Sequence, residues 1–316
     1  MKQTTERKNA YEAITNKILD ALNQGKCPWR RPWRGGGAGY ISYSTGRPYS
    51  LLNQILLLMD DKQPCEYLTF KQVKDAGGMV KKGAKSTTIY FWKRLHYENQ
   101  ATDENGQPEY DEDGKPVMLE ANPIYLKGYN VFSIADCEGI EPKHAGDFTP
   151  SDAQPIEAAQ AIADKFYNAP GAPRLNVQFS GRAFYIPTSD MVVVPELKQY
   201  ELAEEYYSTL FHETIHSTGH ASRLGRIKAD KAAAFGSEDY SREELVAEIG
   251  AAYLINRAGI DCEKAFNNSI AYLQGWSRHL ANKPREFAIA CAQAEKAASW
   301  VLNAGATDST AAPCES

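Results

Sequence analysis

The spacing of apolar residues in the second half of the chain predicts two long helices. The first stretch places five apolar side chains at helical intervals: Leu202, Tyr206, Leu210, Phe211 and Ile215. We therefore expect an amphipathic helix of about four turns that ends near Gly219. A second helix is expected over residues 241–254, where the apolar side again repeats at this spacing through Leu245, Ile249, Ala252 and Tyr253.

Short runs of β-branched and aromatic residues predict strands in both halves. Residues 183–186 and 191–194 are such runs, and Pro187-Thr188-Ser189-Asp190 between them has turn chemistry, which predicts a hairpin just before the first helix. In the first half, residues 87–94 and 124–132 are predicted strands. The acidic stretch 98–122 between them contains the turn dipeptides Asn105-Gly106 and Asp113-Gly114, which indicate a hairpin or a loop.

The order of these elements indicates an α+β chain with two domains. We predict an N-terminal α+β domain over residues 1–140, with the acidic stretch 98–122 inserted in it, and a linker over 141–155 that is rich in Pro, Gly, Asp and Ser. A second domain over 156–306 should begin with a helix at 156–168 and end with two or three helices after residue 260. The polar tail 307–316 is expected to be disordered. With 316 residues, 43% of them hydrophobic, the chain can bury two cores.

Charge divides the chain into two unlike parts. Residues 1–95 contain 17 positive and 7 negative side chains, a net charge of +10, whereas the whole chain carries −5 and the remainder therefore −15. Aromatic residues alternate with the cations. Cationic side chains bind the phosphate backbone and aromatic rings stack on unpaired bases, so this combination favours binding of single-stranded DNA. The candidate residues are Trp29, Arg30, Arg31, Trp33, Arg34, Lys71, Lys81, Lys82, Lys85, Trp92 and Lys93. In the alternative interpretation, the tryptophans belong to a core and the lysines to a solvated face.

The first predicted helix contains His212-Glu213-Thr214-Ile215-His216, which has the H-E-x-x-H pattern of zinc hydrolases. Residues four apart lie one turn apart on the same helical face, so both imidazoles can reach one metal ion. The carboxylate of Glu213 then lies beside the ion, where it can accept a proton from a water molecule. So short a pattern also occurs by chance, so the surrounding sequence must show whether it forms a metal site. A hairpin followed by this helix is the order found in zincin peptidases, where a sheet edge holds an extended substrate.

A third metal ligand is expected, because catalytic zinc usually has three protein ligands and a water molecule. The metzincin pattern fails, since its last position is Ser222, and a ligand set that included His220 would span about 12 Å along a straight helix. Glu244 and Glu248 in the second helix are spaced like the E-x-x-x-D of gluzincins, in which the first acid binds metal and the second orients a histidine. We favour Glu244 as the ligand, with Glu248 or His220 as supporting or alternative groups. In a competing interpretation, Glu244 forms a helix capping box with Ser241.

Several ordered motifs resemble one known family, the ArdC-type antirestriction proteins of conjugative plasmids. Those that resemble its single-stranded-DNA-binding domain are Pro28-Trp29, Pro32-Trp33, Thr45-Gly46-Arg47-Pro48-Tyr49-Ser50-Leu51-Leu52-Asn53, Thr69-Phe70-Lys71-Gln72 and Gly77-Gly78-Met79-Val80-Lys81-Lys82-Gly83. Those that resemble its metallopeptidase domain are Tyr185-Ile186-Pro187, Asp190, Pro195, 212–219, Arg223-Leu224, Tyr240 and 243–248. The resemblance extends over residues 8–303 and adds Asn53 to the candidate DNA-binding residues.

The resemblance implies a protein that binds incoming single-stranded plasmid DNA and protects it from host restriction during conjugation, with a gluzincin-type zinc metallopeptidase domain. Three residues would hold one Zn²⁺, with Mn²⁺ or another divalent metal as the alternative: His212, His216 and Glu244. Glu213 would be the catalytic base acting on an unknown protein substrate, and the candidates to stabilise an oxyanion are Tyr240, Arg223 and His220. Two other functions stay in competition. One is a DNA-dependent metalloprotease that acts on DNA-bound or crosslinked proteins, and the other is a non-enzymatic DNA-coating protein with a structural zinc.

The remaining sequence features concern location. The N-terminus is polar and charged, and the longest strongly apolar run is 55–59, so we expect neither a signal peptide nor a membrane span. The six cysteines form no C-x-x-C pair, which is typical of reduced thiols in the cytoplasm. We therefore expect the protein to act inside bacterial cells, including the recipient cell, with single-stranded DNA as partner, double-stranded DNA as a weaker one, and no membrane.

Overall fold

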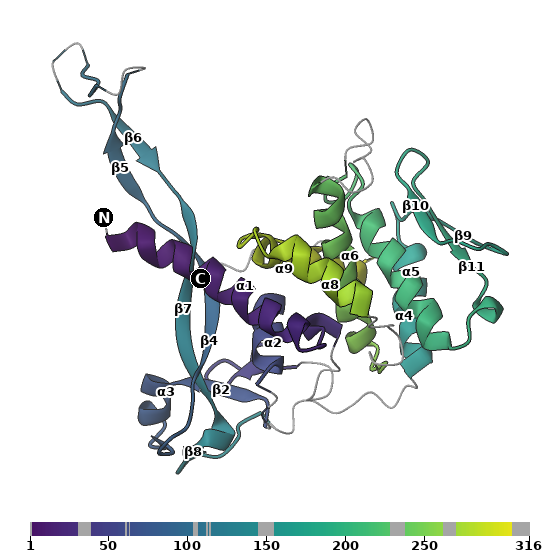
Figure 1. Ribbon diagram of the computed structural model, residues 1–316, viewed down its shortest axis with the longest axis horizontal. Helices are drawn as coiled ribbons and strands as arrows, with labels where there is room; N and C mark the ends of the chain where they lie inside the picture. The colour runs from purple at the N-terminus through teal and green to yellow at the C-terminus, as the bar shows by residue number, and fades with distance from the viewer. Residues whose placement is uncertain are drawn as a thin grey trace.

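The computed structural model describes residues 2–30, 39–60, 62, 64–103, 107–111, 113, 115–144, 155–227, 238–261 and 270–304. Helices and sheets are both present, as an α+β chain requires (Figure 1). The elements of the first half are α1 (Lys2–Asn23), η1 (Pro28–Arg30), β1 (Ile41–Ser42), α2 (Leu51–Leu58), β2 (Glu66–Thr69), α3 (Phe70–Asp75), β3 (Met79–Val80), β4 (Thr87–Arg94), β5 (Tyr97–Gln100), β6 (Met118–Ala121), β7 (Ile124–Ser133), η2 (Ile134–Asp136) and β8 (Cys137–Glu138). Those of the second half are α4 (Pro155–Tyr167), β9 (Arg174–Gln178), β10 (Phe184–Ile186), β11 (Met191–Pro195), η3 (Leu197–Gln199), α5 (Ala203–Thr218), α6 (Glu238–Arg257), α8 (Ile270–Leu280) and α9 (Glu286–Leu302).

The first half is built on a four-stranded sheet with the strand order β1-β2-β7-β4. The long strands β4 and β7 are antiparallel and pair without interruption from Thr87↔Val131 to Arg94↔Ile124. The predicted strand at 87–94 is confirmed, and that at 124–132 extends one residue further. Asn53 of α2 satisfies the open edge of β4, because its amide accepts from the Tyr90 N–H and donates to the Tyr90 carbonyl, both at 2.8 Å. At Tyr90 the outer edge of β4 is therefore paired with a side chain.

A two-stranded ribbon projects from the end of this sheet, away from the body of the molecule (Figure 1). Its strands β5 and β6 are antiparallel, with pairs from Tyr97↔Ala121 to Gln100↔Met118. The hairpin expected within residues 98–122 is confirmed. Two acidic side chains, Glu98 and Glu120, stand directly opposite each other in the ribbon.

The second half contains a three-stranded sheet with the order β10-β11-β9, covered by α5. The predicted hairpin is confirmed, since β10 and β11 are antiparallel neighbours from Phe184↔Val193 to Ile186↔Met191. Its turn requires a left-handed backbone at Asp190, with φ of +48°, a conformation that Asp tolerates better than most residues. Helices α6 and α9 pack behind α5. The predicted helix over 202–215 is confirmed as α5, and the helices expected after residue 260 correspond to α8 and α9.

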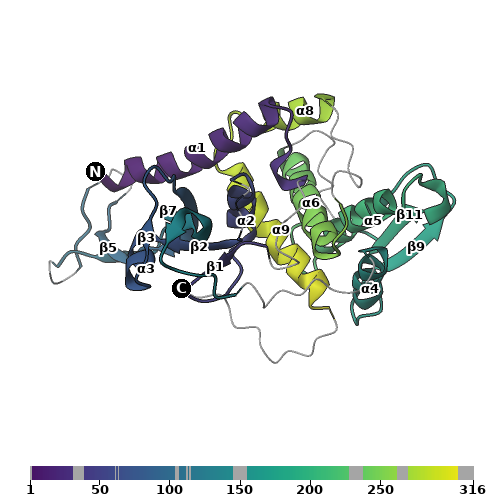
Figure 2. The same cartoon turned by 90° about the horizontal axis from the view of Figure 1, so that it is seen from below.

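The largest buried apolar cluster runs through both halves of the chain, whereas the sequence predicts two separate cores. Apolar residues of α1, η1 and α2 belong to the same cluster as those of α5, α6 and α9. Helix α1 lies along α8 and reaches α9 (Figure 2). Trp29 is 2% exposed, and its ring lies 5.6 Å from that of Phe287 and 6.3 Å from that of Trp276. The halves are therefore joined by shared packing, and two smaller clusters lie at the N-terminal sheet.

Two further features differ from the sequence-based expectations. Helix α6 begins at Glu238, three residues before Ser241, so Ser241 lies inside the helix and the capping-box interpretation of Glu244 is wrong. Helix α1 was not predicted. Most of the expected linker, 145–154, and the tail 307–316 lie outside the described residues. No helix in the described ranges is long and apolar enough to cross a membrane.

Candidate functional site

Helix α5 carries the H-E-x-x-H motif, and its ends are set by local chemistry. Glu204 and Glu205 lie in its first turn, where their charges interact favourably with the positive end of the helix dipole. The helix stops at Gly219, whose N–H bonds to the His216 carbonyl at 2.8 Å. A Cβ on Gly219 would lie 2.8 Å from Cγ1 of Ile227, so a larger residue here would require the Ile227 side chain to move. The motif is thus held in the last two turns of a well-bounded helix.

A second glycine sets the distance between α5 and α6. A Cβ on Gly250 would lie 2.9 Å from Ile215, which is fully buried between the two helices. Since real Cβ atoms do not approach so closely, any larger residue would push the helices apart. This close approach brings the start of α6 over the histidines of α5.

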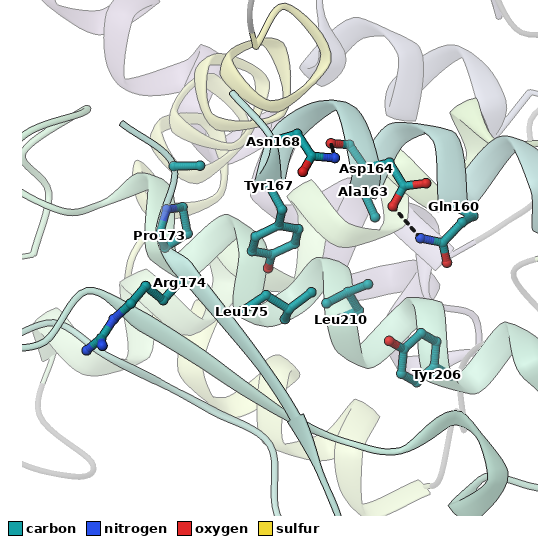
Figure 3. Close-up of a pocket in the computed structure, with 11 residues that line it drawn as sticks. Gln160, Ala163, Asp164, Tyr167, Asn168, Pro173, Arg174, Leu175, Tyr206 and Leu210 are labelled. Carbon is teal, nitrogen blue, oxygen red and sulfur yellow. Dashed lines mark hydrogen bonds between the residues drawn. The ribbon is translucent and has the colours of Figure 1, made fainter. Parts of the chain in front are cut away.

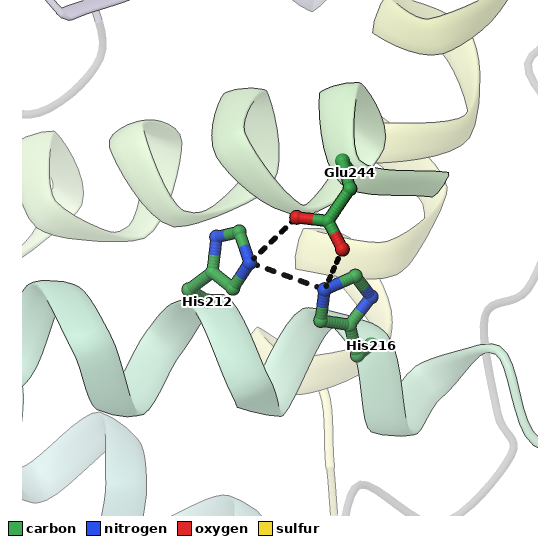
Figure 4. A group of neighbouring side chains, drawn as sticks. All are labelled: His212, His216 and Glu244. Carbon is green, nitrogen blue, oxygen red and sulfur yellow. Dashed lines mark hydrogen bonds and ion pairs between the residues drawn. The ribbon is translucent and has the colours of Figure 1, made fainter. Parts of the chain in front are cut away.

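Three side chains converge on one point there: His212 and His216 from α5 and Glu244 from α6 (Figure 4). The two Nε2 atoms are 3.1 Å apart, and the Glu244 oxygens lie 3.4 Å from the nitrogen of His212 and 3.5 Å from that of His216. Atoms bound tetrahedrally to a zinc ion at 2.0–2.1 Å are separated by about 3.3–3.4 Å. The three groups therefore fit the His, His, carboxylate set of a catalytic divalent metal, by both donor type and spacing.

The charges at this cluster favour a cation. Burial alone would lower the pKa of His216, but its hydrogen bonds to Glu243 and Glu244, with the nearby charge of Glu213, raise that pKa to about 10. Burial alone would likewise raise the pKa of Glu244, but hydrogen bonds to the two imidazoles hold that pKa well below its usual range. The carboxylates around His216 therefore stabilise positive charge at this cluster, as a site for a divalent cation requires.

A second acidic residue, which the sequence analysis did not assign, orients His216. The Nδ1 of His216 lies 3.4 Å from a carboxylate oxygen of Glu243. Arg226 holds this carboxylate by two hydrogen bonds, at 2.8 and 3.1 Å, and also donates to the Ile215 carbonyl at 2.9 Å. A carboxylate on the second ring nitrogen fixes the tautomer and orientation of a metal-binding histidine. In the gluzincin spacing the orienting acid lies four residues after the metal ligand, whereas Glu243 lies directly before Glu244.

Glu248 and His220, the alternatives proposed from sequence, lie elsewhere. Glu248 pairs with Arg30 at 2.5 Å and accepts from the Tyr272 hydroxyl at 2.9 Å. His220 hydrogen-bonds through Nδ1 to Ser222 at 2.8 Å. Among the residues that the structure describes, the converging metal-ligand group consists of His212, His216 and Glu244 alone. The orienting role expected for Glu248 is therefore corrected to Glu243.

Arg223 ties the end of α5 to the hairpin, which conflicts with its suggested role at an oxyanion. Its side chain is 2% exposed and donates to the Ser217 and Gly171 carbonyls, at 2.8 and 2.9 Å, as well as to Asp190. Burial alone would raise the pKa of Asp190, but hydrogen bonds from Arg223 and Tyr185 hold that pKa below its ordinary value. The side chain of Tyr240 lies outside the described residues.

Glu213 is 8% exposed, so the residue is largely shielded from bulk water.

A separate cavity of about 620 Å³ opens between α4, β9 and α5 (Figure 3). It is lined by Tyr206 and Leu210 of α5 and Tyr167 of α4, whose hydroxyl bonds to Thr214 at 2.8 Å. At about 100° per residue, Tyr206 and Leu210 point about 80–160° away from the histidines around the helix axis, and neither histidine lines the cavity. The cavity is thus distinct from the metal-ligand cluster.

The candidate DNA-binding residues divide into buried and exposed groups. Trp29 and Asn53 are buried, and Arg30 is 6% exposed and paired with Glu248. The DNA-binding role suggested for these three is withdrawn, because a buried side chain has no face to offer a base or phosphate. Lys71, Lys81, Lys82, Lys85 and Trp92 are exposed, and Lys93 is half-buried. Arg31, Trp33 and Arg34 lie outside the described residues.

Comparisons with known proteins agree with both halves of this arrangement. Residues 8–132 match the N-terminal domain of anti-restriction factor ArdC, and residues 161–293 match a zincin-like metallopeptidase family. Two Escherichia coli proteins named DNA primase TraC are each 33% identical over 303 residues, which is 94% of this chain but 20% and 27% of theirs. The uncharacterized protein y4eC of Sinorhizobium fredii is 26% identical over 302 residues, 92% of this chain and 91% of its own.

Two crystal structures of the antirestriction ArdC protein from plasmid R388 share the fold, each with a TM-score of 0.67. The metal-free form is 28% identical and the alignment covers 93% of this chain and 96% of that one. The Mn(II)-bound form is 27% identical, with 95% and 99% covered. A zincin-like domain implies a divalent metal, and the three converging ligands supply a site for it. The chain is therefore an ArdC-type protein, in which an N-terminal domain of that family precedes a zincin-like metallopeptidase domain.

Proposed function

We propose that this protein is a metal-dependent peptidase joined to a single-stranded-DNA-binding half, and that it protects incoming plasmid DNA from host restriction during conjugation. The observation that carries the peptidase proposal is the convergence of His212, His216 and Glu244 beside the buried Glu213. The plasmid origin of the structurally similar ArdC protein supports the antirestriction role. The cytoplasm of a bacterial cell is the compartment in which both activities would be needed.

Each residue of the site has a distinct task in this proposal. His212, His216 and Glu244 hold the ion, and Glu243, held by Arg226, keeps the His216 ring in place. A bound divalent ion lowers the pKa of a water molecule towards 7 and polarises a peptide carbonyl. Glu213 accepts the proton of the attacking water and returns it to the leaving amine.

We propose Zn²⁺ as the ion, with Mn²⁺ as the alternative. Two imidazoles and one carboxylate are the ligand set of several zinc hydrolases. The Mn(II)-bound ArdC structure motivates the alternative. Elemental analysis of the purified protein, followed by chelation and addition of each metal in turn, would identify the ion that restores activity. A purified protein without any transition metal, and without affinity for one, would refute the metal assignment.

The substrate is proposed to be a protein segment in extended form. Strand β10 is an edge of the sheet that α5 covers, so its outer backbone groups can pair with another strand. Such edge pairing uses backbone groups and not side chains, so it can hold extended segments of many sequences.

The decisive experiment replaces Glu213 with Gln. Metal content and affinity for a single-stranded oligonucleotide should be unchanged, while peptidase activity on a protein substrate should fall by about 10²–10⁴-fold. Glu204→Gln, the same chemical change in the first turn of the same helix, is the matched control and should retain activity. If Glu213→Gln protects DNA from restriction as well as the wild type does, peptidase activity is not required for that phenotype. If Glu213→Gln cleaves as fast as the wild type, the catalytic assignment is wrong.

A second function, DNA-dependent cleavage of DNA-bound proteins, is favoured by one observation. The segment around η1 contributes Arg30 to a buried pair with Glu248, one helical turn after Glu244. A change in the N-terminal half can therefore reach the metal-site helix by direct contact. Cleavage of a DNA-bound protein should accelerate on addition of single-stranded DNA if this function holds, and should be independent of DNA if it does not. The alternative of a structural zinc lacks support among the described residues, because neither His220 nor Glu248 joins the cluster.

A further inference from the structure

One face of the paired strands β4 and β7 carries aromatic and polar side chains that the metal centre does not use. Successive side chains of a strand point to opposite faces, so the pairing of the two strands decides which residues share a face. We call this the α1/α3 face, after the two helices that contact it. Its members, in pairs across the strands, are Arg94 and Ile124, Trp92 and Leu126, Tyr90 and Gly128, and Thr88 and Asn130, with Phe132 beyond them.

Helices cover the two ends of this face and leave its middle open. At one end the ring of Tyr11 in α1 lies 6.3 Å from that of Trp92. At the other end the ring of Phe70 in α3 lies 6.4 Å from that of Phe132. Figure 1 shows α1 crossing the strands near the ribbon, while α3 lies beside their far end. Between the helices, Gly128 and Asn130 are exposed.

The open stretch has the form of a stacking platform. A Cβ on Gly128 would lie 3.1 Å from Cγ2 of Thr88 and 3.3 Å from Cε1 of Tyr90, so both side chains occupy the space beside the glycine. Tyr90 is half-buried and packs in part against the main apolar cluster. Trp92 and Phe70, at the two ends, are 41% and 51% exposed. Unpaired bases stack on such rings whatever their sequence.

Cations and a hydrogen-bonding pair accompany these rings. The Lys74 ammonium lies 4.9 Å from the centre of the Phe70 ring, and exposed Lys71 is in the same short helix. Arg94 is exposed at the opposite end of the face. In the middle, Thr88 and Asn130 share a hydrogen bond of 2.9 Å, and an amide offers both a donor and an acceptor to a base edge. Positive ends, aromatic surfaces and a polar centre complement phosphates and unpaired bases.

We propose that the α1/α3 face binds single-stranded DNA, with bases stacked on Tyr90 and Phe70 and phosphates held by Lys71, Lys74 and Arg94. This inference rests on the proposed single-strand binding and names where it occurs. From Trp92 to the level of Phe132 the face is six residues long, or about 20 Å at 3.3 Å per residue. It uses residues that are accessible, in place of the buried Trp29, Arg30 and Asn53.

The test measures the affinity of the full-length protein for a fluorescein-labelled oligothymidylate by anisotropy. Phe70→Ala removes one aromatic ring, and Gly128→Val crowds the side chains of Thr88 and Tyr90 in the middle of the face. Each should weaken binding by about 5- to 150-fold, the range for loss of one stacked base. The joint replacement of Lys71 and Lys74 by Ala should lower the salt dependence of binding by about 0.7 per lost phosphate contact.

Two matched controls separate this face from general effects. Lys127→Ala removes an exposed lysine from the same strand β7 but from its opposite face. Phe179→Ala removes an aromatic residue that is 80% exposed in the second half. Both variants should bind the oligonucleotide with an affinity within about twofold of wild type, because neither residue lies on the proposed DNA-binding face. Thermal unfolding followed by circular dichroism shows whether each variant is folded, and Phe70→Ala is expected to be, since Phe70 is half-exposed.

The outcomes distinguish the interface from the function on which it rests. Weaker binding by the Phe70, Gly128 and double lysine variants, with both controls unchanged, supports the proposal. Wild-type affinity in folded Phe70→Ala and in the double lysine variant overturns the interface, while single-strand binding itself stands. Equal losses in Lys127→Ala and the double lysine variant also overturn it, because charge alone would then explain binding. Failure of the wild type to bind the oligothymidylate refutes the proposed function and this inference together.

Discussion

The buried pair between Arg30 and Glu248 allows a direct measurement of how strongly the two halves are joined. The side chains are 6% and 14% exposed, the guanidinium lies 2.5 Å from the carboxylate, and it also stacks 3.9 Å from the centre of the Tyr272 ring. Arg30→Met keeps much of the side-chain volume but leaves Glu248 buried beside the Tyr272 hydroxyl without its cation. Breaking a buried pair in this way costs about 3–5 kcal/mol of unfolding free energy, because one charge remains uncompensated.

The double variant separates the pair's coupling from the effect of each residue. When both charges are replaced, as in Arg30→Met with Glu248→Met, no buried charge remains, and such replacements are often neutral or stabilising. We therefore expect the double variant to lie within about 1 kcal/mol of wild type, far less than the sum of the two single variants. Urea unfolding of the full-length protein, followed by tryptophan fluorescence, gives these free energies from midpoints and slopes.

An exposed ion pair provides the control. Lys198 pairs with Glu196 at 2.6 Å, but its side chain is 75% exposed, so Lys198→Ala should cost less than about 1 kcal/mol. A loss below about 1 kcal/mol in Arg30→Met would contradict the argument that this pair is buried and uncompensated when broken. Additivity of the two single variants would refute the coupling itself.

Three further predictions concern the metal site and its supports. Gly250→Ala should cost about 1–3 kcal/mol of unfolding free energy and weaken metal binding, because the added methyl group collides with Ile215. Denaturation measures the stability, and competition with a chromogenic chelator measures the metal affinity. Unchanged metal affinity would show that the spacing of α5 and α6 does not determine metal binding. Glu243→Gln should lower metal affinity about 10–100-fold in the same competition assay, whereas equal affinity would show that the ring is oriented by other contacts. The pKa of Asp190 is lower in the folded protein than in the unfolded chain, because Asp190 pairs with Arg223. This pairing therefore stabilises the fold at pH values above the ordinary Asp pKa of about 3.9, and the stabilisation is lost as the pH falls through the folded-state pKa. The difference in unfolding free energy between wild type and Asp190→Asn should accordingly be largest near neutral pH and shrink below about pH 4; a difference that grows on acidification would contradict the sign of the shift.

Elements defined by local patterns could be predicted from the sequence. Helix α5, the hairpin before it and the strands β4 and β7 follow from apolar periodicity and turn residues within short windows. The pairing of His212 with His216 followed from helical spacing, and Glu244 was favoured over Glu248 by its likeness to the gluzincin spacing. Helix α1 had a visible signal that was missed, since Tyr11, Ile14, Ile18 and Leu22 recur at helical intervals.

Other features depend on contacts between distant parts of the chain and could not be predicted. Trp29 and Arg30 lie in a basic, aromatic segment, but their partners Phe287 and Glu248 are more than 200 residues away in sequence. Composition does not reveal which side of such a segment faces a core. Likewise, the rotation of α6 about its axis decides whether Glu243 or Glu248 lies next to His216, and Arg226, outside that helix, fixes the carboxylate that does. Spacing alone does not determine that rotation.

The packing of α1 on the C-terminal helices has a consequence for synthesis of the chain. Thr15 donates a hydrogen bond to the carbonyl of Pro284, 269 residues later. At about 5–20 residues per second on a ribosome, the apolar side of the first helix waits roughly 13–54 s for its partner to emerge. During that interval a nascent chain displays Ile14 and Ile18, which are buried once folding is complete. Binding by a chaperone should therefore be strongest before the last helices are translated and should decline on their release.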